Sequence, residues 1–208
     1  CTFPRIILAE VNTHRMLSKN TSSSRAIPFN KMVESVENDP FIPIAWQKEH
    51  KGMQGSEYIV DEREIAELRK EWINARNSAL VSAMRLNNHT LDDVDNRKSN
   101  VTKQLCNRLL EPFMWTTMLI TGPRSGWDNF FNLRCPSYHS NGELGNEIFK
   151  SKKDFIRETG MDNDGVELMS DIDWLKNNKG QAEIHIMDLA EKIYDALNES
   201  TPKQLKAG

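Results

Sequence analysis

The chain lacks the features that mark membrane, disulfide-stabilised and nucleic-acid-coating proteins. Its three cysteines, Cys1, Cys106 and Cys135, are too few and odd in number for a disulfide scaffold, so we expect a reducing, cytoplasmic compartment. The longest apolar runs, such as Ile6–Ala9, are too short to span a bilayer, and the first residues do not form a signal-peptide pattern. The net charge of −3 lacks the basic excess expected of a protein that coats nucleic acid.

What the sequence does contain is enough apolar material for a core. Of its 208 residues, 38% are hydrophobic and 27% are charged, which excludes global disorder and fits one large domain or two small ones. No repeat or low-complexity tract divides the chain. We therefore predict a single domain that covers residues 1–208.

The hydrophobic pattern predicts helices and a few strands in irregular order, which is typical of an α+β fold. Apolar runs rich in β-forming residues predict two strands, Arg5–Glu10 and Phe113–Thr121. Helical spacing and helix-stop signals predict four helices, Asp61–Leu86, Thr102–Glu111, Trp127–Arg134 and Gln181–Asn198, with a fifth short one within Val33–Pro43. The polar segment Asn87–Asn100 is typical of a loop, and Gly122-Pro123 of a turn.

The segment Pro136–Gly180 differs in composition from the rest of the chain. It holds nine acidic and six basic residues, so it carries the whole net charge while the remainder is balanced. Its apolar positions permit two short helices. We predict a structured insertion at about residues 136–180 within the single domain.

The stretch Thr13–Arg25 carries the side chains most suited to binding chemistry. Its thirteen residues include two arginines, a lysine, a histidine, an asparagine and six hydroxyl side chains, with no carboxylate. Arginine binds phosphate oxygens in pairs, and hydroxyl and backbone N–H groups complete such a shell. The composition predicts an anion site for a phosphate ester, but a solvated serine-rich loop explains the composition equally well.

The spacing within this stretch resembles the signature R-H-R-x-x-S-x-N-E-x-S-x-R of the flavin-dependent thymidylate synthases. The positions that match are His14, Arg15, Ser18, Asn20, Ser23 and Arg25. Two positions depart, because Thr13 replaces the first arginine and Thr21 replaces the glutamate. Six matches among eight fixed positions are a specific signal, and the T-H-R form is similar to variants from viral and metagenomic sequences.

Three further stretches resemble the same family, in the expected order along the chain. Asn107–Pro112 is similar to A-R-x-x-L-P, with Arg108 as the shared arginine. Asn129–Arg134 is similar to N-F-x-x-L-R, and Gln181–Ile184 to the last residues of A-Q-x-E-I. The resemblance runs from Arg5 to Leu197 and leaves out the segment at 136–180, for which the family implies no role.

The resemblance implies a specific reaction and assembly. Members convert dUMP to dTMP, with methylenetetrahydrofolate as carbon donor, FAD as hydride carrier and NADPH as reductant. Their α+β subunits, with a mixed sheet and long helices, form homotetramers whose active sites lie where subunits meet. No enzyme cysteine attacks the pyrimidine, which fits Cys106 and Cys135, because both suit a small core residue. No nucleic-acid polymer and no membrane is implied as a partner.

The resemblance also implies roles for individual residues. Those implied for FAD are His14, Arg15, Ser18, Asn20 and Asn129. Those implied for the nucleotide are Glu10, Ser23, Arg25, Arg108 and Arg134. Of these, Arg25 takes the phosphate, and Arg134 reaches the pyrimidine, where a cation stabilises negative charge on the base. Ser23 and Arg134 are the expected catalytic residues, and no metal is implied.

The departures from the signature leave the substrate open. Thr13 and Thr21 remove opposite charges together, so we expect the pocket to persist with altered contacts to flavin or nucleotide. Glu10 stands where many members have glutamine, and a carboxylate there can accept a hydrogen bond from an exocyclic amine such as that of cytosine. A dCMP substrate, or a hydroxymethylated product, is therefore an alternative to dTMP formation.

Other classes of function explain parts of the sequence. Cys135-x-x-x-His139 is half of a zinc motif, but no second pair supports it. A non-catalytic nucleotide- or RNA-binding protein would use the arginines and aromatic residues, although the spacing of Trp72 indicates core packing and the acidic charge disfavours RNA. A family member that has lost turnover is a third possibility.

Overall fold

The computed structural model describes residues 1–51, 55, 57–88, 101–140, 147–160, 169–178, 180 and 182–201. The chain divides into two compact units. The first consists of Cys1–Trp46 and Ile59–Gly122, and the second of Gln47–Tyr58 and Pro123–Gly208. Segment 136–180 belongs to the second unit, together with the helices on either side of it. That the whole chain forms one domain stays a prediction.

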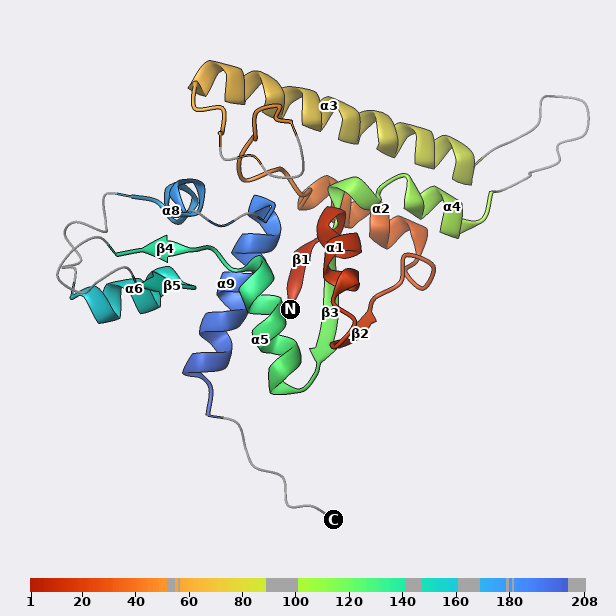
Figure 1. Cartoon of the computed structure of the whole chain (residues 1–208). Coiled ribbons are helices and arrows are strands. Elements are labelled where there is room, and N and C mark those ends of the chain that lie inside the picture. Colours follow the sequence, from red (N-terminus) through yellow and green to blue (C-terminus); the bar gives the residue numbers. More distant parts are fainter. Residues whose placement is uncertain are drawn as a thin grey trace, which may run out of the picture. The chain divides into compact units, whose positions relative to one another are not determined.

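The first unit contains a three-stranded sheet in the order β1-β3-β2 (Figure 1). Its strands are β1 (Thr2–Pro4), β2 (Ser18–Thr21) and β3 (Trp115–Thr121). Both outer strands pair antiparallel with β3, with Phe3 opposite Thr116 and Asn20 opposite Leu119. The predicted strand at 113–121 is confirmed, whereas the predicted mixed sheet is wrong for the described strands, because all of their pairings are antiparallel.

The strand predicted at Arg5–Glu10 is also wrong. This run forms a 3-10 helix, Arg5–Ile7, followed by helix α1, Leu8–Thr13. Ile7 and Val11 are buried while Ile6 is 40% exposed, which is the spacing of a helix and not the alternation of a strand. The run is too short for periodicity to separate the two.

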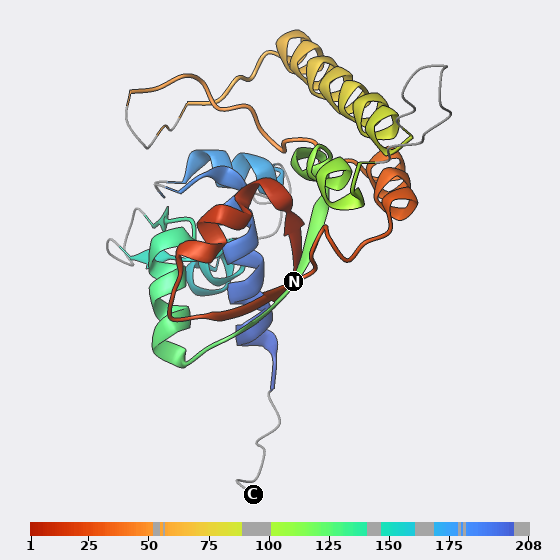
Figure 2. The same cartoon turned by 90° about the vertical axis from the view of Figure 1, so that its right-hand side faces the viewer.

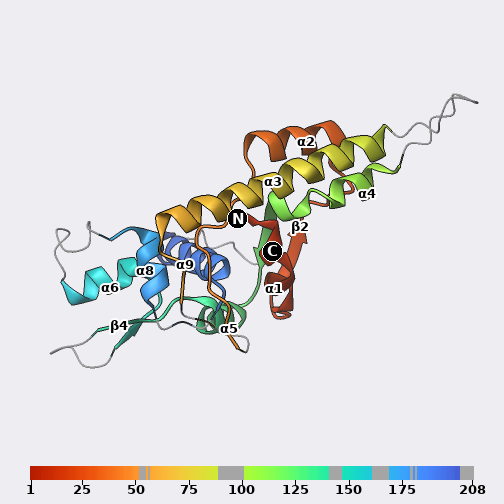
Figure 3. The same cartoon turned by 90° about the horizontal axis from the view of Figure 1, so that it is seen from above.

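Three helices lie side by side in the first unit (Figure 3). They are α2 (Phe29–Asn38), α3 (Glu62–Asn87) and α4 (Lys103–Arg108). A 3-10 helix, Glu111–Phe113, leads from α4 into β3. The core between these elements consists of buried apolar side chains, among them Met32, Val36, Leu80, Ala83, Cys106, Leu110 and Phe113. Trp72 packs against this core, as its spacing predicts.

The helix boundaries follow from local signals. The carboxylate of Asp61 accepts hydrogen bonds from the N–H groups of Arg63 and Glu64, which caps α3 close to its predicted start. The helix predicted at 102–111 begins as expected but ends at Arg108, before Pro112. The short helix expected within 33–43 begins earlier, at Phe29, directly after Pro28. The loop predicted at 87–100 lies almost wholly outside the described residues.

The second unit is built on two packed helices, α5 (Arg124–Arg134) and α9 (Ile184–Glu199) (Figure 2). Between them in sequence lie the hairpin strands β4 (Tyr138–His139) and β5 (Ile148–Phe149), with helices α6 (Lys152–Thr159) and α8 (Asp171–Asn177). The two short helices predicted within 136–180 are confirmed. The final helix starts after its cap, Glu183, and Gln181 lies outside the described residues. No helix among the described residues is long and apolar enough to cross a membrane.

A half-buried carboxylate joins segment 136–180 to α9. Glu191 accepts hydrogen bonds from the hydroxyl of Tyr138 at 3.2 Å and from the backbone N–H of Lys152 at 2.7 Å. Burial, which outweighs these two bonds, and the nearby carboxylates Asp195 and Asp188 raise the pKa of Glu191 to about 7. Its charge therefore changes near neutral pH.

The raised pKa of Glu191 predicts a pH-dependent stability. Between the ordinary glutamate value and about 7, the folded protein binds a proton that the unfolded chain has released, so the free energy of unfolding falls as the pH rises. The expected loss is at most about 3 kcal/mol between about pH 5 and about pH 8. Glu191→Gln keeps the shape and removes the titration, so its stability should fall less over this range in urea unfolding followed by tryptophan fluorescence. The control Glu199→Gln, on the exposed part of α9, should keep the wild-type slope, and a wild-type slope in Glu191→Gln would contradict the prediction.

Candidate functional site

The predicted anion-binding stretch Thr13–Arg25 is not a single loop. It consists of the end of α1, a tight turn, strand β2 and a second turn that leads to α2. The hydrogen bond from the N–H of Leu17 to the carbonyl of His14, at 3.2 Å, closes the first turn. In the second turn, the N–H of Ala26 bonds to the carbonyl of Ser23 at 2.9 Å. The stretch is thus fixed at several points along its length.

Ser18 and Asn20 lie on an exposed face of the sheet. Strand side chains alternate between faces, and on β3 Thr116 and Met118 are buried while the residues between them face outward. Asn20 is paired with Leu119, which is 67% exposed, and Ser18 is paired with Thr121. Two residues expected to contact FAD are therefore accessible on a surface that also exposes an apolar side chain.

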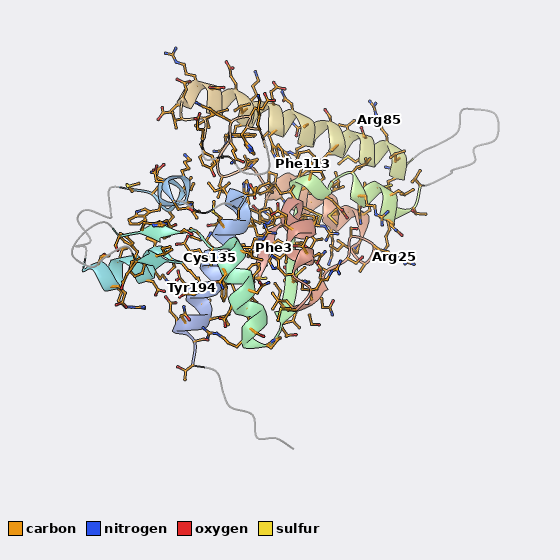
Figure 4. The ribbon with its side chains drawn as sticks, viewed as in Figure 1. Phe3, Arg25, Arg85, Phe113, Cys135 and Tyr194 are labelled. Carbon is orange, nitrogen blue, oxygen red and sulfur yellow. The ribbon has the colours of Figure 1, made fainter. Side chains whose placement is uncertain are left out.

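The three arginines of the first unit that are expected to bind FAD or the nucleotide are exposed, and their guanidinium groups make no hydrogen bond or ion pair with any residue in the described ranges. These are Arg15, Arg25 and Arg108. Figure 4 shows Arg25 at the surface of the unit. Exposed guanidinium groups without a carboxylate partner are free to bind an anion. The three side chains are therefore accessible, and the anion site stays a prediction.

A buried amide brings the turn that carries Arg25 next to α4. The Nδ2 group of Asn107, which is fully buried, donates to the carbonyl of Ser24 at 2.7 Å and to the carbonyl of Ile27 at 3.0 Å. Arg25 lies between these two acceptors in sequence, and Arg108 follows Asn107. The two arginines, expected to share one nucleotide, thus come from backbone segments that are directly joined.

A buried guanidinium holds the other end of the same turn. Nη1 of Arg5 donates to the carbonyl of Ser22 at 3.2 Å and to Oγ1 of Thr116 at 3.3 Å, while Nη2 forms an ion pair with Glu111 at 3.2 Å. The Arg5 side chain is only 14% exposed, so these partners replace most of its hydration. Arg5 thereby connects the end of β2 with β3 and with the segment after α4.

Ser23 is exposed and its hydroxyl is oriented by the backbone. Its Oγ accepts a hydrogen bond from the N–H of Arg25 at 3.2 Å, in the manner of a serine turn. The hydroxyl proton stays available to a ligand oxygen. This geometry fits a binding hydroxyl beside the phosphate group expected at Arg25, and its expected catalytic role stays a prediction.

Two basic side chains of the stretch, Lys19 and His14, are less accessible than expected. The ammonium group of Lys19 donates to the carbonyl of His14, and partial burial lowers the pKa of Lys19. It therefore stabilises the turn between α1 and β2 instead of adding to the exposed charge. His14, which caps the end of α1, is 6% exposed, so it is the least accessible of the residues expected to contact FAD.

The helix before the turn carries Glu10 and the first departure from the signature. Glu10 is half-buried on α1, and its backbone carbonyl accepts a hydrogen bond from the hydroxyl of Thr13 at 2.6 Å. Thr13 thus satisfies the backbone at the end of its own helix. The second departure, Thr21, is half-buried on β2 opposite Met118. Both threonines are uncharged, so replacing the arginine and the glutamate of the signature removes one charge of each sign.

Asn129 and Arg134 belong to α5 in the second unit. Asn129 is exposed and Arg134 is half-buried. Five residues of helix separate them, which corresponds to a rotation of roughly 140° about the axis, so their side chains leave the helix in different directions. Their convergence with residues of the first unit stays a prediction.

Cys106 and Cys135 occupy the positions expected of core residues, whereas Cys1 is exposed. Cys106 is fully buried and Cys135 is 6% exposed. Burial raises the pKa of both thiols, so neither forms a thiolate nucleophile readily. Among the residues described, no group of three or more histidine, cysteine, aspartate or glutamate side chains could hold a metal ion.

The sequence did not point to Arg5, Asn107 or Glu111 as parts of the site. Arg5 lies in an apolar run, and its acceptors are 17 to 111 residues away along the chain. Asn107 carries one signal, because it stands where the resembling motif has alanine. The hydrogen bonds from its side chain to Ser24 and Ile27, which alanine cannot make, are a physical reason for asparagine at this position.

Comparison with known proteins adds no relative. No model of a protein family matches the chain, and no curated protein matches its sequence. The assignment of function therefore depends on the motifs and on the geometry described above.

Replacing Arg5 should test the buried network. Lysine at this position keeps the charge but cannot reach three acceptors with a planar fork, so Arg5→Lys should lower the free energy of unfolding by about 1–3 kcal/mol. The matched control is Arg124→Lys, which alters an exposed ion pair to Asp128 and should change stability by less than about 1 kcal/mol. Denaturant unfolding measures both. Equal effects of the two substitutions would show that the network of Arg5 contributes no more than a surface pair.

Proposed function

We propose that the protein is a flavin-dependent thymidylate synthase that methylates dUMP to dTMP, with methylenetetrahydrofolate as carbon donor and NADPH as reductant. One observation carries the proposal. Arg25 and Arg108, which the motifs assign to one nucleotide, have guanidinium groups without a partner in the described part of the chain, and they extend from segments joined through Asn107. This arrangement supports a binding site for the phosphate of a nucleotide.

The nucleotide contacts follow from the chemistry of the exposed groups. The guanidinium of Arg25 binds the phosphate, with the Ser23 hydroxyl donating to a second oxygen. Arg108 adds a second positive charge at the same end of the nucleotide. Arg134 stabilises negative charge that develops on the pyrimidine, and Glu10 accepts a hydrogen bond from a donor on the base.

The exposed polar side chains of the first unit fit a flavin dinucleotide. Ser18 and Asn20 can donate to ring oxygens, Arg15 can bind the diphosphate, and Leu119 offers apolar surface beside them. Asn129 would add an amide from α5, and His14 would contribute with the small part of its side chain that is exposed. FAD, when bound, supplies the hydride for the reduction.

The proposed assembly is a homotetramer with active sites at subunit interfaces. Two features of the single chain support association. The outward sheet face exposes Leu119, and helix α3 exposes Val81 and Leu86. Exposed apolar surface on a strand and on a long helix favours contact with another chain.

A second candidate is a related flavin- and folate-dependent methylase or hydroxymethylase that acts on dCMP. The observation that favours it is the carboxylate of Glu10, because a carboxylate accepts a hydrogen bond from the amino group of cytosine and repels the carbonyl oxygen of uracil. A homologue that binds nucleotide without turnover is the remaining alternative, motivated by Thr13 and Thr21.

Product analysis by mass spectrometry should decide between these candidates. The purified protein is incubated with FAD, NADPH and methylenetetrahydrofolate, with dUMP and dCMP in separate reactions. We expect dTMP from dUMP. A methylated or hydroxymethylated dCMP would instead support the second candidate. Binding of FAD without any product would support the non-catalytic homologue.

The phosphate contact is tested by Arg25→Ala. Loss of a charge-assisted pair of hydrogen bonds should weaken the binding of dUMP about ten- to a hundredfold. The matched control is Arg85→Ala, which removes the same group from the exposed end of α3 (Figure 4) and should leave the affinity unchanged. Isothermal titration calorimetry measures both. An unchanged affinity in Arg25→Ala would refute the assignment of the phosphate to this residue.

A further inference from the structure

Asn107 has an unusual environment for an amide side chain. It is fully buried on α4, and its near neighbours in sequence, Cys106 and Leu110, belong to the apolar core of the first unit. Its Nδ2 group makes two hydrogen bonds, but Oδ1 is buried without a partner among the described residues. An unpaired buried acceptor is costly, so the core alone would favour an apolar residue here.

The two bonds of Asn107 have a specific target. They end on the carbonyl groups of Ser24 and Ile27, which bracket Arg25 and Ala26. A single planar amide that donates to both carbonyls fixes the distance between them and therefore the shape of the turn. The other end of the turn is fixed at Ser22 by Arg5. The exposed side chain of Arg25 thus extends from a backbone that is held on both sides.

We propose that Asn107 is a positioning residue that orients Arg25 for the phosphate group of the nucleotide and sets its place beside Arg108. The inference rests on the proposed function for the identity of the ligand. Asn107 itself is buried and does not touch the nucleotide. Its contribution is preorganisation, because a turn that is already ordered loses less conformational freedom when the anion binds.

Asn107→Asp is the most informative substitution, because it preserves shape and removes the two donors. At about pH 8 a carboxylate at this position repels both carbonyl groups, so the turn loosens. Trypsin cleaves after Arg25, and the rate of cleavage of the Arg25–Ala26 bond reports the order of the turn without any ligand. We expect this cleavage to become at least about tenfold faster, and dUMP to bind at least about tenfold more weakly by calorimetry. The affinity for FAD should change less than the affinity for dUMP, because the expected FAD contacts on β2 lie outside the turn.

The pH dependence separates positioning from general loss of structure. A protonated carboxyl can donate one hydrogen bond to a carbonyl, so Asn107→Asp should regain part of its affinity for dUMP, relative to the wild type, at about pH 5. The control is Cys106→Ala, a neighbouring buried change on the same helix that does not touch the turn. It should alter neither the cleavage at Arg25 nor the affinity.

The results distinguish failure of this inference from failure of the proposed function. If Asn107→Asp matches the wild type in both cleavage and affinity, Asn107 does not position the turn. Equal effects of Asn107→Asp and Cys106→Ala would also overturn the inference, because they would indicate a general loosening of α4. If the wild type binds no dUMP, the proposed function fails, and with it the role of Asn107 in nucleotide binding. Faster cleavage in Asn107→Asp would in that case still show that Asn107 orders the turn.

Discussion

The first unit depends on the burial of one guanidinium group. Arg5 is largely removed from water, and a buried cation is tolerated only where acceptors surround it. Its acceptors come from the end of β2, from β3 and from the segment after α4, so these three regions must be in place together. The polar network thus constrains the same backbone that presents the exposed arginines. The largely buried charge of Arg5 therefore holds the backbone from which the exposed arginine side chains extend.

In the candidate site, the less accessible polar groups bind the backbone and the exposed polar groups are available to a ligand. Arg5 and Asn107 bind backbone carbonyls, and Asn107 is fully buried, whereas the guanidinium groups of Arg25 and Arg108 are exposed and have no partner among the described residues. Such a combination gives a rigid backbone with free cations on it, which is how proteins prepare a site for an anion before it arrives. Asn129 and Arg134, the residues expected from the second unit, belong to α5, a helix that packs against α9.

The sequence predicts this structure well where the signal is local. Helix α3 was predictable because Asp61 caps it and its apolar spacing extends over many turns, and β3 because its residues favour strands. The helical structure of the run Arg5–Glu10 was not predictable, since a few apolar residues fit a strand or a helix equally well. For the candidate site, spacing predicts Arg25 and Arg108 as nucleotide-binding residues. The roles of Arg5 and Asn107 depend on partners far away along the chain, which no local pattern reports.

The position of β3 at the centre of the sheet has a consequence for synthesis. Thr2 and Thr117, which face each other across β1 and β3, are separated by 115 residues along the chain. During translation the two N-terminal strands therefore emerge long before the strand that they both need. Contacts between such distant segments form slowly, and unpaired strands invite association with other chains. The growing chain should thus rely on chaperones until β3 has left the ribosome.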